Sequence, residues 1–144
     1  MKITLKSKVI GDLKFVLNHF DEGLFKYLLP PGANLIKFGG SKAGDIVHLK
    51  LPLAGEWVSE ITEHHSDSDH YYFIDEGRKL PFPLKQWRHK HVLRRHGEYT
   101  IIEDHMSFST GYILSDLLFY PVLFVSFSPR FWQYKKYFKK VLSR

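Results

Sequence analysis

The chain has 144 residues, of which 44% are hydrophobic and 25% are charged, and it contains no cysteine. This length suits one domain with a sizeable core, which we expect to span residues 1–144, and the lack of cysteine excludes disulfide bonds and thiolate metal ligands. The formal net charge is +6, and six cations lie in the last fifteen residues, which contain no acidic residue.

The first predicted elements are one strand and two short helices. In residues 2–9 apolar and polar side chains alternate, which is typical of a half-buried strand. The same residues lack the continuous apolar segment of a secretion signal, so we expect a cytoplasmic protein. Asp12 is placed to cap a helix that begins at Leu13, and a second short helix is expected from Asp21 to Leu29, before Pro30.

The middle of the chain is predicted to consist of strands separated by turns. The predicted strands are 34–39, 45–53, 56–64, 69–75, 84–95 and 98–108. Glycine, proline, serine and aspartate mark the breaks between them. Short connections favour an antiparallel arrangement, because parallel crossovers need about ten or more residues each. With the first strand, the sheet is expected to have seven strands.

Residues 112–127 form an apolar run that is interrupted by Asp116 and Pro121. The run is shorter than the about 20 residues that a transmembrane helix needs, and a carboxylate in lipid is costly. We therefore do not expect this run to cross a membrane, and the sequence does not predict its course.

A long amphipathic helix is predicted at the end of the chain, with Ser128 as its N-cap and Pro129 in its first turn. Its apolar stripe is Phe131, Tyr134, Phe138 and Val141 or Leu142, and Lys135, Lys136, Lys139 and Lys140 face away. The stripe is expected to cover the apolar face of the sheet, which gives an α+β fold. The lysines are expected to be solvated surface, with an acidic membrane, nucleic acid or a protein partner as alternatives.

Two histidines and one aspartate are the candidate polar residues of the interior. On one predicted strand His89 and His91 share a face with Trp87, and on the next strand the more apolar face carries Asp104. This pattern is compatible with a self-satisfied His–Asp pair in the core, with polar groups in an apolar ligand pocket, with a metal site and with an acid–base catalyst. We expect no metal site, because no third ligand at a suitable spacing is evident.

A second histidine-rich cluster, residues 64–70, falls where a turn between strands is expected. Its aspartates and serines are ordinary turn-forming residues, so the cluster does not by itself predict a metal site. The sequence contains no Ser-His-Asp order, no glycine-rich phosphate loop and no zinc signature. We therefore expect no cofactor.

Several segments, in a fixed order, resemble the START-like superfamily, which is also called SRPBCC. They are GDIVHLKL (44–51), FIDEG (73–77), PFPLKQWRHKHVL (81–93), GEYTIIEDHMSF (97–108) and FWQYKKYF (131–138). The most specific part is Trp87-x-His89-x-His91, followed by Thr100 and Asp104. The sequence departs from the superfamily pattern where the apolar run precedes the terminal helix.

The resemblance implies the helix-grip fold, in which a long C-terminal helix lies across a curved seven-stranded antiparallel sheet, with two short helices after the first strand. It also implies a cavity for a lipid, a polyketide, a quinone or a similar hydrophobic molecule. Some members of the superfamily are aromatase/cyclases, so the resemblance leaves catalysis open.

Noncatalytic binding or carriage of a small hydrophobic ligand is the function that we expect. The expected ligand-binding residues combine an apolar wall with polar groups that orient one end of the ligand: Phe73, Trp87, His89, His91, Thr100, Ile102, Asp104, Met106, Phe131 and Tyr134. A cyclase-like enzyme with a pocket histidine as acid–base catalyst is one alternative. Weak contact with an anionic membrane through the lysines of the terminal helix is another.

Overall fold

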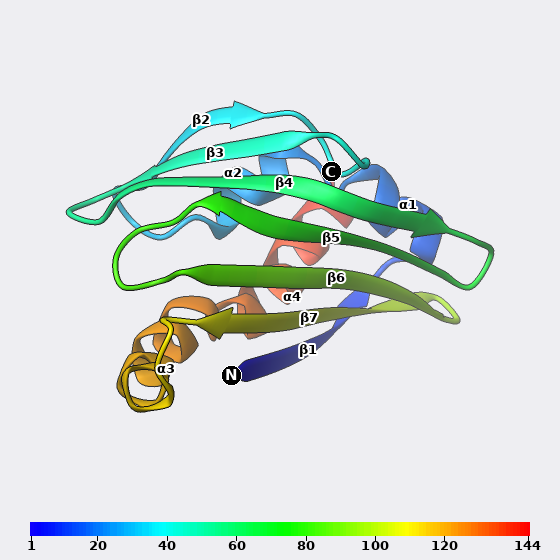
Figure 1. The fold of residues 1–144 in the computed structure, drawn as a ribbon. Helices are drawn as coiled ribbons and strands as arrows, with labels where there is room; N and C mark the ends of the chain where they lie inside the picture. Colours follow the sequence, from blue (N-terminus) through cyan, green and yellow to red (C-terminus); the bar gives the residue numbers. More distant parts are fainter.

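A seven-stranded antiparallel sheet with the strand order β1-β7-β6-β5-β4-β3-β2 forms the framework of the computed structural model, which describes residues 1–144 (Figure 1). The strands are β1 (Lys2–Ile10), β2 (Asn34–Phe38), β3 (Ile46–Leu51), β4 (Gly55–Ser66), β5 (His70–Lys79), β6 (Gln86–His96) and β7 (Tyr99–Ser109). The first strand pairs with the last, and β1 and β2 form the two edges of the sheet.

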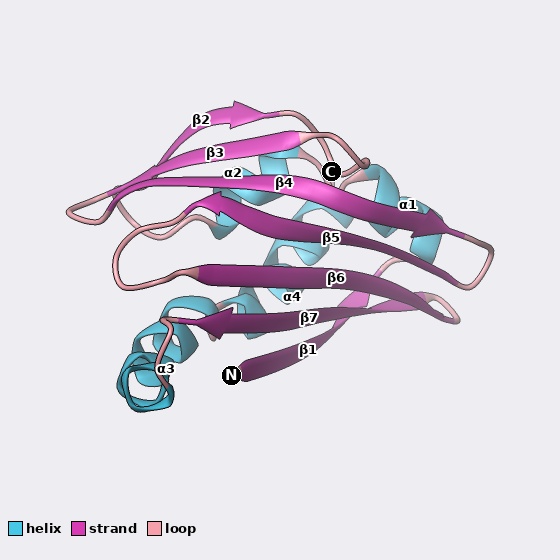
Figure 2. Cartoon of the chain, viewed as in Figure 1, coloured by secondary structure: helices cyan, strands magenta, loops and turns pink.

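Four helices complete the chain. They are α1 (Leu13–Asn18), α2 (Glu22–Leu28), α3 (Ile113–Phe127) and α4 (Arg130–Leu142). The side chain of Asp12 accepts a hydrogen bond from the backbone N–H of Phe15, as the sequence predicts. Asp21, expected as the first residue of the second helix, caps α2 by accepting from the backbone N–H of Leu24. Helices α1, α2 and α4 lie on one side of the sheet, and α3 lies at its end (Figure 2). The predicted α+β helix-grip architecture is confirmed.

Irregular pairing in β4 curves the sheet. The register between β4 and β5 shifts between Val58 and Ser59 and again between Ile61 and Glu63. Each such irregularity bends a strand and increases its local twist. The curvature leaves a concave face toward α4, and this face holds both the core and the site described below.

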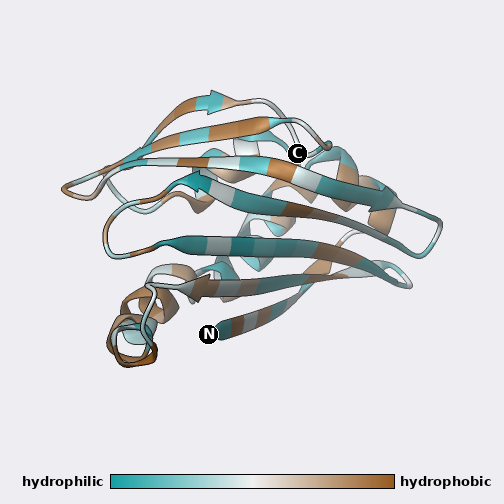
Figure 3. Ribbon diagram, viewed as in Figure 1, coloured by the Kyte–Doolittle hydropathy of each residue, from teal (hydrophilic) through white to brown (hydrophobic).

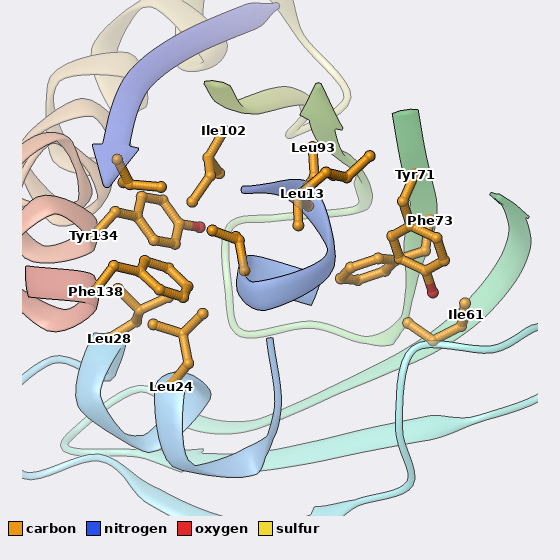
Figure 4. Packing of buried hydrophobic residues seen from close by; sticks show 12 residues of the cluster. Leu13, Leu24, Leu28, Ile61, Tyr71, Phe73, Leu93, Ile102, Tyr134 and Phe138 are labelled. Carbon is orange, nitrogen blue, oxygen red and sulfur yellow. The ribbon is translucent and has the colours of Figure 1, made fainter. Parts of the chain in front are cut away.

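The core is formed where α4 and α2 pack against the concave face. Tyr134 and Phe138 of α4 are buried together with Leu24 of α2 and Ile102 of β7 (Figure 4). Burying a large apolar side chain stabilises the fold by about 1.5–3 kcal/mol. A second cluster joins Trp87 and the C-terminal part of β7 to Leu123 of α3, among other residues. The terminal helix is thus held against the sheet by the apolar packing of Tyr134 and Phe138, both of which belong to the predicted stripe.

The start of the terminal helix differs from the prediction. Ser128 has helical backbone angles and its hydroxyl donates to the carbonyl of Val125, so it does not act as an N-cap. The predicted cap is wrong because α3 leads into α4 with only two residues between them. Phe131 was expected in the buried stripe, but its side chain is 48% exposed, and Arg130 turns inward instead.

The apolar run before the terminal helix forms α3, in spite of Pro121 within it. By length and composition alone, the helical stretch Ile113–Leu142 is long and apolar enough to cross a membrane. Its second half, however, is α4, whose inner face is part of the core. The stretch cannot span a bilayer while the helix-grip core is intact.

Candidate functional site

A cavity of about 350 Å³ lies between the concave face of the sheet and the helices. Most of its lining residues are hydrophobic, and they come from α2, the central strands, the β5–β6 loop, α3 and the first turns of α4. A volume of several hundred cubic ångströms and a mostly apolar wall with a few polar groups are typical of small-molecule sites. The cavity is partly open to solvent.

One part of the wall is a polar cluster, which we call the His–Asp cluster: Asp75, His89, His91, Asp104 and Arg130. Strand pairing brings it together, because Asp75 lies opposite His89 and His91 lies opposite Asp104. The hydrogen bonds run diagonally across these pairs. His89 Nε2 lies 2.8 Å from Asp104 Oδ1, and His91 Nε2 lies 2.8 Å from Asp75 Oδ2. The two imidazole rings stack with their centroids 3.7 Å apart.

Further donors complete the cluster on both carboxylates. Arg130 Nη1 donates to Asp104 Oδ1 over 3.2 Å, and the hydroxyl of Tyr134 donates to the same oxygen over 3.3 Å. Trp87 Nε1 donates to Asp75 Oδ1 over 3.2 Å. Each buried carboxylate therefore has at least two donors, which is how a buried charge is made tolerable.

The two histidines have opposite pKa shifts. Burial and the neighbouring charge of His91 lower the pKa of His89 to about 4, against the opposing effect of Asp104. Burial also disfavours a charge on His91, but its hydrogen bonds to Asp104 and Asp75 and the charges of these carboxylates outweigh burial and raise its pKa. At neutral pH, His89 is therefore the uncharged imidazole of the pair.

The carboxylates remain ionised in spite of burial. Desolvation acts to raise the pKa of Asp104, but the Arg130 guanidinium and the histidine hydrogen bonds lower it well below its usual range. The pKa of Asp75 is lowered as well, because its bond to His91 and the histidine charges together outweigh its desolvation. Arg130 beside Asp104, and the raised pKa of His91 beside Asp75, both act to offset the charge of the two carboxylates.

The expected ligand-binding residues occupy different places. Those that line the cavity are Phe73, Trp87, His89, His91 and Tyr134. Asp104 lies directly behind the two histidines and is hydrogen-bonded to His89. Ile102 and Met106 belong to the two apolar clusters, and the hydroxyl of Thr100 donates to the carbonyl of Gly11. Phe131 lies outside the cavity lining, with Lys135 Nζ 4.2 Å from the centre of its ring.

Known structures share this architecture, although no protein-family model and no curated protein sequence matches the chain. A protein from Nitrosospira multiformis aligns over 100% of both chains with 13% identity and a TM-score of 0.67. The protein XoxI from Bacillus cereus has 16% identity and a TM-score of 0.63, over 97% of this chain and 96% of that chain. A point mutant of norcoclaurine synthase from Thalictrum flavum, in complex with a transition-state analogue, has 15% identity and a TM-score of 0.63, over 84% of this chain and 82% of that chain. The chain shares the helix-grip fold of these structures.

Two polar residues of the His–Asp cluster, Asp75 and Arg130, line the cavity of this helix-grip domain but were not predicted. Asp75 follows Tyr71 and Phe73 at a spacing of two, so strand alternation places it on the same inward face. That signal was present in the sequence. Arg130 was assigned to the basic surface, but it lies one turn before Tyr134 on the inner side of α4. Only its partner Asp104 distinguishes it from the exposed cations nearby.

Asp75, His89 and His91 bring potential metal-ligand atoms within 4.8 Å of one another. Both histidines, however, already form a 2.8 Å hydrogen bond to a carboxylate. The guanidinium of Arg130 also supplies positive charge beside Asp104. The helix-grip site thus balances its charge with protein groups, and we assign no metal to it.

The histidine-rich segment 64–70 spans the end of β4, the β4–β5 turn at residues 67–69 and the first residue of β5, so the expected turn is shorter than the segment. Asp67 accepts backbone hydrogen bonds from Asp69 and His70, and its other oxygen lies 2.9 Å from nitrogens of both His65 and His70. These hydrogen bonds lower the pKa of Asp67. They account for the cluster as turn structure, and none of its residues lines the cavity.

Proposed function

We propose that the protein binds a small hydrophobic molecule in the cavity between the sheet and α4, and does so without catalysing a reaction. The observation that carries the proposal is the cavity of about 350 Å³, apolar over most of its wall, with the His–Asp cluster on one side. A lipid, a polyketide or a quinone fits this chemistry. The norcoclaurine synthase structure with its transition-state analogue supports the view that a helix-grip fold accommodates a small molecule.

The polar end of the ligand is an uncharged group. Both carboxylates of the cluster already accept hydrogen bonds from protein donors, so an ionic group of the ligand would find no free partner there, and a buried unpaired charge is costly. Because His89 is neutral and its Nε2 bonds Asp104, its Nδ1 is an acceptor without a hydrogen-bond partner in the protein. A hydroxyl, or the N–H of an uncharged aromatic amine, is the matching donor, so a quinone fits in its reduced, quinol form.

A pair of related fluorescent probes tests binding. N-phenyl-1-naphthylamine is neutral, and 8-anilino-1-naphthalenesulfonate adds a sulfonate to the same skeleton. The neutral probe should bind at one site per chain and more tightly than the anionic one. Tighter binding of the sulfonate would show that the site prefers an anion, and no saturable binding of either probe would count against the cavity as a ligand site.

The matched variants are Val47→Trp and Ile36→Trp. Val47 is buried and lines the cavity, whereas Ile36 lies on the neighbouring strand β2 and is 53% exposed. Val47→Trp should fill part of the cavity and weaken the neutral probe by about tenfold or more, since a filled cavity has no room for the ring system. Ile36→Trp should leave its affinity unchanged, with circular dichroism as the check on folding.

A second candidate function is acid–base catalysis in the same cavity, favoured by the opposite pKa shifts of two adjacent histidines on its wall. With a pKa of about 4, His89 is a weak base at neutral pH. His91, whose pKa is raised, is the stronger candidate for a group that gives up or takes a proton near neutral pH.

Extraction and mass spectrometry of the bound compound distinguish the two functions. If the protein is an enzyme, His91→Gln expressed in the same cells should carry a different compound from the native chain, because substrate is no longer converted. If the protein only binds, both should carry the same compound. His105→Gln, which changes a histidine on the opposite face of β7, is the matched control.

A further inference from the structure

Helix α3 has an unpartnered apolar face. Its buried side is a single stripe that includes Asp116 and Leu123. The opposite side, which we call the outer face of α3, consists of exposed aliphatic residues: Ile113, Leu114, Leu117, Leu118, Val122 and Val125. Figure 3 shows this helix as one of the most hydrophobic segments of the molecule. Contiguous exposed apolar surface of this kind marks an interaction site.

The serine and aspartate side chains of α3 form their hydrogen bonds within the helix or with the residues just before it. The hydroxyl of Ser126 donates to the carbonyl of Val122 over 2.7 Å, and that of Ser115 donates to the carbonyl of Tyr112 over 3.0 Å. Asp116, the only charged residue of the helix, accepts from the backbone and the side chain of Thr110. The outer face thus presents no polar side chain that needs water or a protein partner, which is what a lipid environment requires.

The two ends of α3 carry aromatic and basic side chains. At its start, Tyr112 is exposed and Lys85 Nζ lies 5.6 Å from the centre of its ring. Just beyond its end, Trp132 is exposed, and Lys135 lies one turn further along α4. Tyrosine, tryptophan and lysine are the residues that anchor a segment at the boundary between lipid and water.

Charge complementarity indicates an anionic surface. From Tyr112 to the end of the chain, the only acidic side chain is Asp116, which is buried. The basic side chains of the same stretch, apart from Arg130, lie on the exposed side of α4 or at its end. Cations near a membrane are attracted by anionic lipids.

The cavity opens beside this face. Phe119, Val122 and Leu123 of α3 line the cavity together with Phe82 of the β5–β6 loop. Phe82 is 95% exposed, and the contact of its apolar ring with water is unfavourable. Leu53, in the nearby β3–β4 turn at the same end of the sheet, is also fully exposed and has a φ of 64° (Figure 1). A leucine with positive φ is strained, which suggests a role for its exposed position.

We propose that α3 docks this end of the protein on an anionic lipid bilayer, with its outer face in the interface and Phe82 and Leu53 beside it. The 15 residues of α3 extend about 22 Å, less than the about 30 Å hydrocarbon core, so α3 lies in the interface and does not span the bilayer. A second copy of the chain fits less well, because protein interfaces combine apolar contacts with hydrogen bonds that this face does not offer.

Docking gives the cavity a source of ligand. With the opening against the bilayer, an apolar molecule passes between lipid and cavity without crossing water. This consequence rests on the proposed function and makes the ligand a molecule that resides in membranes. The docking itself needs no ligand, so the two proposals fail separately.

Flotation with vesicles of phosphatidylcholine and phosphatidylglycerol tests the docking. The native chain should float with the vesicles. Leu118→Glu should reduce the bound fraction by about tenfold or more, because a charge in the apolar layer is costly. Ile36→Glu, with the same change of charge at an exposed apolar residue on edge strand β2, should float like the native chain. Leu118 does not line the cavity, so N-phenyl-1-naphthylamine should bind both variants equally in buffer.

Three outcomes overturn the proposal. In the first, the native chain does not float with the vesicles. In the second, both glutamate variants float as well as the native chain, which shows that the lysines of α4 bind the vesicles without the outer face of α3. The third is a native dimer in light scattering that Leu118→Glu dissociates, without flotation of the native chain. The outer face of α3 is then an interface between two copies.

Discussion

Asp104 is the residue on which the buried charges of the site depend. One oxygen, Oδ1, accepts from His89, Arg130 and Tyr134. Asp104→Ala leaves the guanidinium of Arg130 buried without its carboxylate, so we expect a loss of about 3–5 kcal/mol in the free energy of unfolding. Urea denaturation at pH 7 measures this loss.

Two variants control for the loss of a carboxylate as such. Glu76→Ala removes an acid whose nearest ion pairs, with Arg78 and Arg88, are exposed and 3.7 Å long, and it should cost less than about 1 kcal/mol. Asp104→Leu combined with Arg130→Met removes both charges and should recover most of the loss. If the double variant is as unstable as Asp104→Ala, the buried guanidinium is not the cause.

His89 should give the protein an acid-sensitive stability. Its pKa is about 4 in the folded chain, against an ordinary value of 6.5. Between these values the unfolded chain binds a proton that the folded chain does not, so stability falls as the pH drops from 6.5 to 4, by about 3 kcal/mol in all.

His91 acts in the opposite sense. Because its pKa is raised in the folded chain, its contribution to stability is complete below pH 6.5 and is lost as the pH rises through the pKa of the folded state.

Urea denaturation of the native chain and of His89→Gln across pH 4 to 8 tests these signs. The native chain should be most stable near pH 6.5, and His89→Gln should lose less stability toward pH 4. His96→Gln changes an exposed histidine at the end of β6 and should keep the native slope. An unchanged acid slope in His89→Gln would mean that His89 titrates normally in the folded chain.

The rotation of α4 shows what a helical pattern leaves open. Phe131, Tyr134 and Phe138 fit the expected stripe, yet Arg130, Tyr134 and Phe138 are the residues that face inward. Both sets have helical spacing, and hydropathy favours phenylalanine over arginine at the first position. The ion pair with Asp104, on a strand distant in sequence, decides the rotation. No local property of residues 128–142 contains that information.

The two phenylalanines at these positions should therefore differ in their effect on stability. Phe138 is fully buried, and Phe138→Ala should cost about 3–5 kcal/mol. Phe131 is about half exposed, so Phe131→Ala should cost less than about 1 kcal/mol. Urea denaturation of both variants compares the same substitution on one helix. Equal losses of stability would mean that Phe131 is buried in the apolar stripe, as the sequence predicts.

For the molecule as a whole, the strand pattern predicted the sheet, whereas the cavity was expected only from the superfamily resemblance. Alternation in strands β6 and β7 was sufficient to place His89, His91 and Asp104 on one inward face, because the side-chain period of a strand is two. Helix α3 was not predicted, since an apolar run with a proline suits several structures. The cavity depends on how far the bent strands stand away from α4, and this distance is a property of the assembled sheet.

A cavity of this kind links ligand binding to the stability of the whole fold. A molecule that binds only the folded chain stabilises it by about 2.7 kcal/mol at a hundred times its Kd. For a domain of 144 residues this corresponds to an increase in Tm of about 5–10 °C. N-phenyl-1-naphthylamine should produce this increase in the native chain and in Ile36→Trp, but little in Val47→Trp, when unfolding is followed by circular dichroism at equal probe concentration. An equal increase in all three chains would place the probe outside the cavity, because Val47 lines it and Ile36 does not.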